Sequence, residues 1–118
     1  MHSLQLLSKQ ELGGYKVRVI QSGNRYAIWL GSDALPLFEN VKHFWVAWVE
    51  NKIGESVIFS PHEEKWATRT TLVMRENGLI VGIPESYRKW MGLRKGSVVR
   101  ISYIRFQDKV GFLLEVED

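Results

Sequence analysis

The chain contains no cysteine. It therefore has no disulfide, no thiolate zinc site and no thiol nucleophile, and this absence favours an intracellular setting, which we expect to be the cytoplasm. Long apolar runs are also missing, since no segment approaches the roughly 18 consecutive apolar residues of a membrane helix. Residues 1–14 show no basic region followed by a long apolar run, so we expect no secretory signal and no membrane partner.

Catalytic signatures are missing as well. The three histidines, His2, His43 and His62, have none of the spacings that hold a metal ion, such as His-Glu-x-x-His. The sequence contains no nucleophile elbow and no glycine-rich phosphate loop. We therefore expect a protein that is not an enzyme and that carries no metal and no cofactor.

Aromatic residues and local positive charge are what the sequence has in excess. Five Trp, five Phe and four Tyr among 118 residues supply enough apolar area for a compact core. The net charge is +3, but residues 66–105 hold eight basic and two acidic side chains, which gives this segment a net charge of +6. Such an excess favours a polyanionic partner, although a solvated surface rich in arginine would give the same pattern.

Short alternating runs predict eight β-strands. β-Branched and aromatic residues that recur with a period of two are typical of strands. The predicted strands are 15–21, 25–30, 43–51 and 56–60 in the first half, and 70–75, 79–83, 98–106 and 110–116 in the second. Turn residues separate the two members of each pair, so we expect four hairpins.

Each half also contains one short helical segment between its hairpins. In the second half Pro84 suits the first helical turn, and Gly92 provides the stop. In the first half Ser32 or Asp33 can cap a turn, and Pro36 argues against a long helix. The order hairpin, helical turn, hairpin therefore occurs twice.

The two halves superimpose without a gap at an offset of 53 residues (77 − 24), which places Asn24 on Asn77. Apolar positions meet apolar positions along this alignment, as Ile28 meets Val81. Sequence identity between the halves is close to the chance level, so the shared order of elements is the stronger evidence for an internal repeat. A repeated unit that cannot bury its own face is expected to pack against its copy.

Four motifs follow one another in the second half, and they are Ile83-Pro84, Met91-Gly92-Leu93, Lys95-Gly96-Ser97 and Val99-Arg100-Ile101. This succession resembles the swapped-hairpin domain of AbrB- and MazE-type DNA-binding proteins. The first half is similar to the MazE branch at Gly23, Asn24, Ala27, Ile28 and Leu30, although Gly31 stands where that branch has a proline.

In that family, two chains exchange hairpins to complete one barrel-like β body. The resemblance implies a mainly β, swapped-hairpin AbrB-like β-barrel that one chain builds from two tandem pseudo-repeats, each with one short helix. We expect an N-terminal extension at 1–14, a degenerate MazE/AbrB-like copy at 15–61, a linker at 62–69 and an AbrB-like copy at 70–118. Both copies would form one compact domain, a pseudo-dimer in one chain, and a further homodimer stays open.

Family members bind DNA through basic residues on the first two strands and on the loop between them. Carried over by position, the resemblance implies DNA contacts at Arg18, Arg25, Arg69 and Arg75. The family often has a further arginine two residues before the Ile-Pro proline, but this chain has Gly82 there, and Trp29 in the first copy.

The helical residues Arg88 and Lys89 could hold a further phosphate or could form an ordinary solvated helix face. The predicted function is the docking of a basic β face on double-stranded DNA. The protein would then be a transcriptional regulator or a small chromatin-associated protein.

The tryptophans support an alternative. Trp45 and Trp48 lie three apart in one predicted strand and should face opposite sides, so one is expected in the core. The other, together with Trp66, could form a protein interface. The protein would then be a non-enzymatic interaction module or an accessory subunit of a replication or transcription complex. Toxin neutralisation, which MazE-like proteins achieve through an extended acidic tail, is disfavoured because only EVED follows the last strand.

Overall fold

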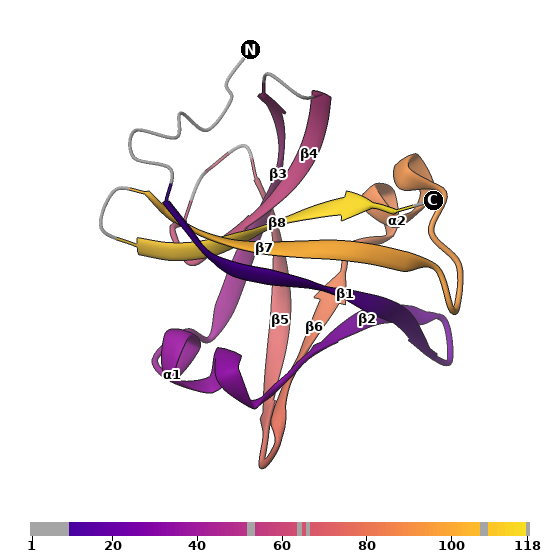
Figure 1. Cartoon of the computed structure of the whole chain (residues 1–118). Helices are drawn as coiled ribbons and strands as arrows, with labels where there is room; N and C mark the ends of the chain where they lie inside the picture. The colour runs from indigo at the N-terminus through magenta and orange to yellow at the C-terminus, as the bar shows by residue number, and fades with distance from the viewer. Residues whose placement is uncertain (1–9, 52–53, 64, 66, 107–108, 118) are drawn as a thin grey trace.

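The computed structural model describes residues 10–51, 54–63, 65, 67–106 and 109–117 (Figure 1). Its elements are, in chain order, β1 (Gln10–Ser22), β2 (Arg25–Leu30), a 3-10 turn (Ser32–Ala34), α1 (Leu35–Phe38), β3 (His43–Asn51), β4 (Gly54–Ser60), β5 (Thr68–Arg75), β6 (Gly78–Ile83), α2 (Glu85–Met91), β7 (Val98–Phe106) and β8 (Lys109–Val116). The predicted strands and both helical segments are therefore present, and β1 begins earlier than predicted, at Gln10.

The strands close into one antiparallel barrel in the order β1-β2-β6-β5-β3-β4-β8-β7, and β7 returns to β1. Four neighbouring pairs are hairpins of consecutive strands. The other four pairs, β2–β6, β5–β3, β4–β8 and β7–β1, join strands that are far apart in sequence. Figure 1 shows β1 lying along β7 across the front of the barrel. Closure gives each described strand a partner on both sides, which removes exposed edges.

Phenylalanines fill the centre of the barrel. The rings of Phe59 and Phe112 stack with their centroids 4.6 Å apart, and Phe44 meets Phe112 edge to face at 5.4 Å. Phe38 of α1 enters from one end and packs edge to face on Phe44 at 5.1 Å. All four side chains are fully buried. The interior is thus a packed core, as expected for an eight-stranded barrel.

The described tryptophans do not belong to this core. Trp45 and Trp48 occupy opposite faces of β3, as predicted, but both are only half-buried, so the expectation that one of them is a core residue is wrong. Trp48 lies near the end of the strand, where it meets Trp90 of α2 instead of the phenylalanines. Trp66 lies outside the described residues.

The two sides of the barrel differ in how far their outer surface is covered. On β3, β4, β7 and β8, a second buried cluster points away from the phenylalanines and consists of Ala47, Val49, Ile58, Ile104 and Leu113. The outward residues of β2, β5 and β6 and those of β1 from Lys16 on are instead exposed or half-buried, except Gly78, which Trp29 covers. An open β face is therefore found on the β1-β2-β6-β5 side.

Two tyrosines close the end of the barrel beside α1. The hydroxyl oxygens of Tyr15 and Tyr103 are 2.8 Å apart, and the backbone N–H of Gly31 donates to the Tyr15 hydroxyl at 3.1 Å. The ring of Tyr103 packs against Phe38 with the centroids 6.1 Å apart. Burial, and then the hydrogen bond with Tyr15, raise the pKa of Tyr103 well above its ordinary value of 10. The folded barrel therefore holds Tyr103 as a neutral phenol.

This raised pKa predicts a loss of stability in alkali. The contribution of Tyr103 is fully present below pH 10, its ordinary pKa, and is lost as the pH rises above that value. Unfolding then releases a proton from Tyr103, so this group should lower the free energy of unfolding by up to about 1.4 kcal/mol per pH unit. Urea denaturation above pH 10 should show a shallower pH dependence for Tyr103→Phe than for the wild type. Equal slopes would contradict the burial of this phenol.

Gly78, at the start of β6, lies beneath the indole of Trp29. A Cβ atom at position 78 would collide with the carbonyl oxygen of Leu30 and would lie 3.0 Å from the Trp29 ring. We predict that Gly78→Ala lowers the free energy of unfolding by about 2–3 kcal/mol, because the backbone of a neighbouring strand must move. Urea denaturation at neutral pH measures the change.

Gly31→Ala is the matched control. The backbone at Gly31 is extended, and a Cβ atom there would meet only the flexible side chain of Asp33, at 3.3 Å. This substitution should change stability by about 0.5 kcal/mol or less. If both substitutions cost the same, Trp29 does not pack on β6 in the manner described.

Candidate nucleic-acid interface and the pocket beside α2

The predicted DNA-binding arginines project from the open side of the barrel. Arg18 lies on β1, Arg25 begins β2, and Arg69 and Arg75 lie near the two ends of β5. All four are exposed, and each occupies an outward position in the alternation of its strand. We call the outer side of β1, β2, β6 and β5 the arginine face.

The strand registers show how the arginines are distributed over this face. Arg25 and Arg69 lie toward the end of the sheet where β6 leads into α2. Arg75 pairs with Gly78 at the opposite end, and Arg18 precedes Val19, which pairs with Ile28 in the second half of β2. The structure therefore brings the four arginines onto one surface, but it spreads them around that surface.

The positive charge of the arginine face is not neutralised within the described residues. The two ion pairs found there are Lys16–Glu117 and Lys89–Glu85, each at 3.1 Å, and neither includes one of the four arginines. Arg18 donates through Nη1 to the carbonyl oxygen of Gly96 at 3.1 Å, which keeps its full charge. The face is therefore suited to an anionic partner.

An apolar strip runs between the arginines. Trp29 of β2 lies opposite Ile80 of β6, and Ile80 lies opposite Val73 of β5, while Ile20 lies opposite Ala27. The exposed fractions of Trp29, Val73 and Ile20 are 36%, 41% and 39%. Sequence reasoning missed this strip, although the outward positions of the predicted strands contain the signal.

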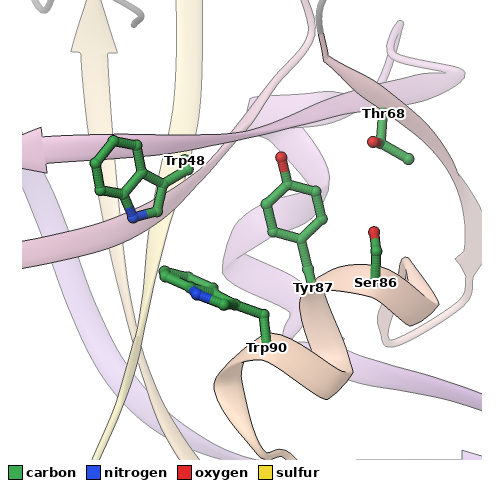
Figure 2. Close-up of a pocket in the computed structure, with 5 residues that line it drawn as sticks. All are labelled: Trp48, Thr68, Ser86, Tyr87 and Trp90. Atoms are coloured by element: carbon green, nitrogen blue, oxygen red, sulfur yellow. The ribbon is translucent and has the colours of Figure 1, made fainter.

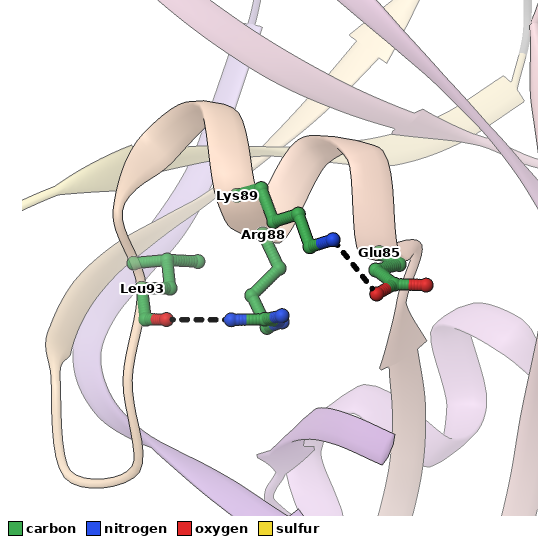
Figure 3. Close-up of polar contacts among 4 residues, drawn as sticks. All are labelled: Glu85, Arg88, Lys89 and Leu93. Atoms are coloured by element: carbon green, nitrogen blue, oxygen red, sulfur yellow. Dashed lines mark hydrogen bonds and ion pairs between the residues drawn. The ribbon is translucent and has the colours of Figure 1, made fainter. Parts of the chain in front are cut away.

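The helical pair Arg88 and Lys89 is engaged within the protein (Figure 3). The guanidinium carbon of Arg88 lies 4.3 Å from the ring centroid of Tyr26, and Nη1 is 3.5 Å from the carbonyl oxygen of Leu93. Lys89 pairs with Glu85 one helical turn earlier, and both side chains are exposed. Arg88 therefore fastens α2 to β2, and these two residues belong to α2 and not to the strands of the arginine face.

Trp45 lines a hollow of about 500 Å³ beside α1, together with Lys42, His43 and Lys109 among other residues. His43 meets the Trp45 ring edge to face, with the centroids 6.2 Å apart. Trp45 also lies opposite Arg69 in the β3–β5 ladder. One predicted interface tryptophan is thus adjacent to the arginine face.

A second tryptophan lines a pocket of about 530 Å³ that we call the α2 pocket, with the lining residues Trp48, Thr68, Ser86, Tyr87 and Trp90 (Figure 2). Trp48 and Trp90 meet edge to face, with centroids 6.5 Å apart and ring planes at 83°. Burial raises the pKa of Tyr87, while the hydrogen bond to Thr68 lowers it by less. The Trp48 indole nitrogen is buried without a hydrogen-bond partner.

Among the described residues, no group of three or more His, Cys, Asp and Glu side chains lies close enough to hold a metal ion. None of the helices in this part of the chain has the length and apolar character needed to cross a membrane.

Comparisons of the chain with protein-family models, with curated proteins and with solved structures found no match. The resemblance to AbrB- and MazE-type domains therefore remains a prediction that rests on its motif residues.

Proposed function

We propose that the barrel is a swapped-hairpin body built from two related halves, residues 10–60 and 68–116. Exchanging the halves maps β1, β2, β3 and β4 onto β5, β6, β7 and β8, and it leaves the strand order of the closed barrel unchanged. The ladder between the first hairpin of one half and the second hairpin of the other occurs twice, as β1–β7 and as β5–β3. This invariance supports the proposal.

The registers of the first hairpins support it further. Val19 pairs with Ile28 in the first half, and Leu72 pairs with Val81 in the second. The offset is 53 residues for both strands (72 − 19 and 81 − 28), as the sequence alignment predicts.

The second hairpins are related by a different offset. Tyr15 pairs with Ile101, and its counterpart Thr68 (15 + 53) pairs with Val46. Val46 therefore corresponds to Ile101, at an offset of 55 residues (101 − 46). The loop before the third strand of each half accounts for the difference, because it spans 39–42 in the first half and 92–97 in the second. The gapless alignment holds only for the first hairpins.

The function that this geometry supports best is docking of the arginine face on double-stranded DNA. The observation that carries the proposal is the set of four outward arginines that have no carboxylate partner among the described residues. Arginine binds phosphate oxygens through charge-assisted hydrogen bonds and so positions a protein on the duplex.

The middle of the arginine face indicates what kind of DNA-binding protein this is. Trp29 and Gly82 stand at the positions where the family often has arginine, and their partners in the β2–β6 ladder, Ile80 and Ala27, are apolar. Base reading by arginine is therefore not expected at these positions, and affinity would come mainly from phosphate contacts. This favours a small chromatin-associated protein over a regulator that recognises one site.

A mobility-shift titration with random-sequence duplex tests the proposal. If the four arginines each contact a phosphate, the slope of log affinity against log salt should be about −3.6. The double variant Arg69→Ala, Arg75→Ala should reduce the magnitude of this slope by about 1.8. Its melting temperature should stay close to that of the wild type, because both side chains are exposed.

The matched control is Lys42→Ala with Lys109→Ala, which removes the same charge from positions outside the arginine face. It should leave the salt slope almost unchanged. If the two double variants weaken DNA binding equally, only the net charge of the protein matters. If the arginine double variant binds DNA as well as the wild type, the arginine face is not the DNA-binding site.

The apolar strip favours a second candidate function on the same face, namely docking of a protein. Exposed tryptophan surrounded by arginine is typical of the residues that dominate protein interfaces. Trp29, Ile80 and Val73 lie side by side on three strands, where they would contribute apolar area. The arginines around them would then match an acidic rim on the partner.

DNA binding and protein docking differ in their response to salt and to substitutions that leave the charge of the face unchanged. Ile20→Thr with Val73→Thr reduces the exposed apolar area, keeps β-branched residues in both strands and leaves the charge unchanged. Protein docking predicts that a partner retained by the wild type at about 0.5 M salt, where surface charges are screened, is lost by this variant. Duplex DNA binding at low salt should stay within about threefold of the wild type, since phosphate contacts persist. Loss of both activities would contradict this separation.

A further inference from the structure

The two ends of the barrel correspond through the registers of the long-range ladders, yet they are filled differently. Thr68 of β5 takes the place of Tyr15 of β1, because Thr68 lies opposite Val46 and Tyr15 lies opposite Ile101. Val46 therefore corresponds to Ile101 in the same strand alignment. Two residues further along each strand, Trp48 corresponds to Tyr103 of the other end.

At the α1 end, an aromatic ring with a hydroxyl group fills the space. The rings of Tyr15 and Tyr103 lie with their centroids 5.9 Å apart, and their hydroxyl groups are hydrogen-bonded to each other. The Tyr15 hydroxyl oxygen also accepts a hydrogen bond from the backbone N–H of Gly31. The space between Tyr15 and Tyr103 is therefore filled by side chains of the protein itself.

At the α2 end, no phenol stands at the strand position that corresponds to Tyr15, but Tyr87 of α2 brings one to it from the helix. Thr68 offers only a hydroxyl and a methyl group, and Tyr87 of α2 reaches it with a hydrogen bond. A pocket of about 530 Å³ still remains beside them.

A hydrogen-bond donor is also left over at this end. The indole nitrogen of Trp48 is buried, and no acceptor lies within hydrogen-bond distance. Figure 2 shows this nitrogen on the side of the ring that faces Trp90. Trp90 is 53% exposed, so it can shift and admit a ligand atom. An oxygen acceptor placed here would relieve the cost of a buried donor without a partner.

The charge of the lining restricts the ligand class. The described residues around the pocket are aromatic or carry hydroxyl groups, and none of them is acidic or basic. Among the described lining residues, an anion would find no cation to pair with, and a cation would find no carboxylate. A neutral aromatic ring that carries an oxygen atom can pack against the aromatic walls and can accept a hydrogen bond from the Trp48 indole N–H.

We propose that the α2 pocket binds a neutral phenol-type ring, whose oxygen accepts the indole N–H of Trp48 and whose ring packs against Tyr87 and Trp90. The ring can come from a free small molecule or from a tyrosine side chain, and both share this chemistry. The inference uses the correspondence between the two halves, but it does not rest on DNA binding, because the pocket lies outside the arginine face.

The probe is p-cresol, which has the ring and hydroxyl of a tyrosine side chain. Titrated into the full-length, ¹⁵N-labelled protein, it should shift the indole N–H signal of Trp48 downfield in a saturable manner and perturb that of Trp90. The indole signals of Trp29 and Trp45, which lie elsewhere, should stay in place. Toluene lacks the oxygen and should bind about tenfold more weakly, without the downfield shift.

Three variants separate the ring from the hydrogen bond. Trp48→Phe keeps an aromatic wall but removes the N–H donor. It should therefore weaken the binding of p-cresol by about tenfold and change the binding of toluene little. Thr68→Tyr adds a second phenol beside Tyr87 and should abolish binding by filling the pocket. Trp90→Ala removes one wall of the pocket at an exposed position and should weaken the binding of both p-cresol and toluene.

N-acetyltyrosinamide distinguishes the two sources of the ring. Binding of both p-cresol and this amide would support a tyrosine side chain as the occupant, and binding of p-cresol alone would support a small molecule. The proposal is overturned if p-cresol leaves the Trp48 signal unmoved up to its solubility limit, or if folded Thr68→Tyr binds it as well as the parent. Should Thr68→Tyr not fold, unchanged binding by Trp90→Ala would overturn the proposal equally.

Discussion

Two ladders between strands that are far apart in the chain, β1–β7 and β3–β5, hold this molecule together. A two-stranded hairpin is only marginally stable in water, and each of the four hairpins would expose unpaired edges without these ladders. The core has the same dependence, since Phe59 from the first half stacks on Phe112 from the second. Neither half can therefore bury its apolar face without the other.

Closure of the barrel also decides where a partner can dock. The β3, β4, β7 and β8 side buries apolar side chains on both faces, in the core and in the second cluster. The β1, β2, β6 and β5 side keeps an open outer surface. It presents unneutralised arginines around an apolar strip, a combination in which the charges favour DNA and the strip favours protein. The salt dependence of binding reports which contribution is larger.

The elements of this fold could be predicted from the sequence because their signals are local. Alternation of apolar and polar residues marked the strands, and Pro84 with Gly92 marked α2, whose C-cap Gly92 adopts the left-handed conformation at φ 67°. The four candidate arginines are likewise on one face, because strand alternation fixes the side to which each points.

Features that depend on long-range contacts could not be predicted in the same way. The sequence alignment of the two halves could not detect the two-residue difference in loop length. A shift of two positions in a strand preserves its inward and outward faces, so apolar residues are still aligned with apolar residues. The role of Arg88 depends on Tyr26, which lies in the other half of the chain. Trp48 is half-buried because it lies where the barrel ends, and strand alternation does not show that position.

The most direct test of the account is a set of backbone nuclear Overhauser effects recorded on the intact chain at low concentration. Interlocked halves predict cross-strand contacts between Val17 and Val99 and between Trp45 and Arg69 within one molecule. Contacts between β1 and β3 in place of these pairs, or cross-strand signals that appear only when two separately labelled chains are mixed, would contradict it.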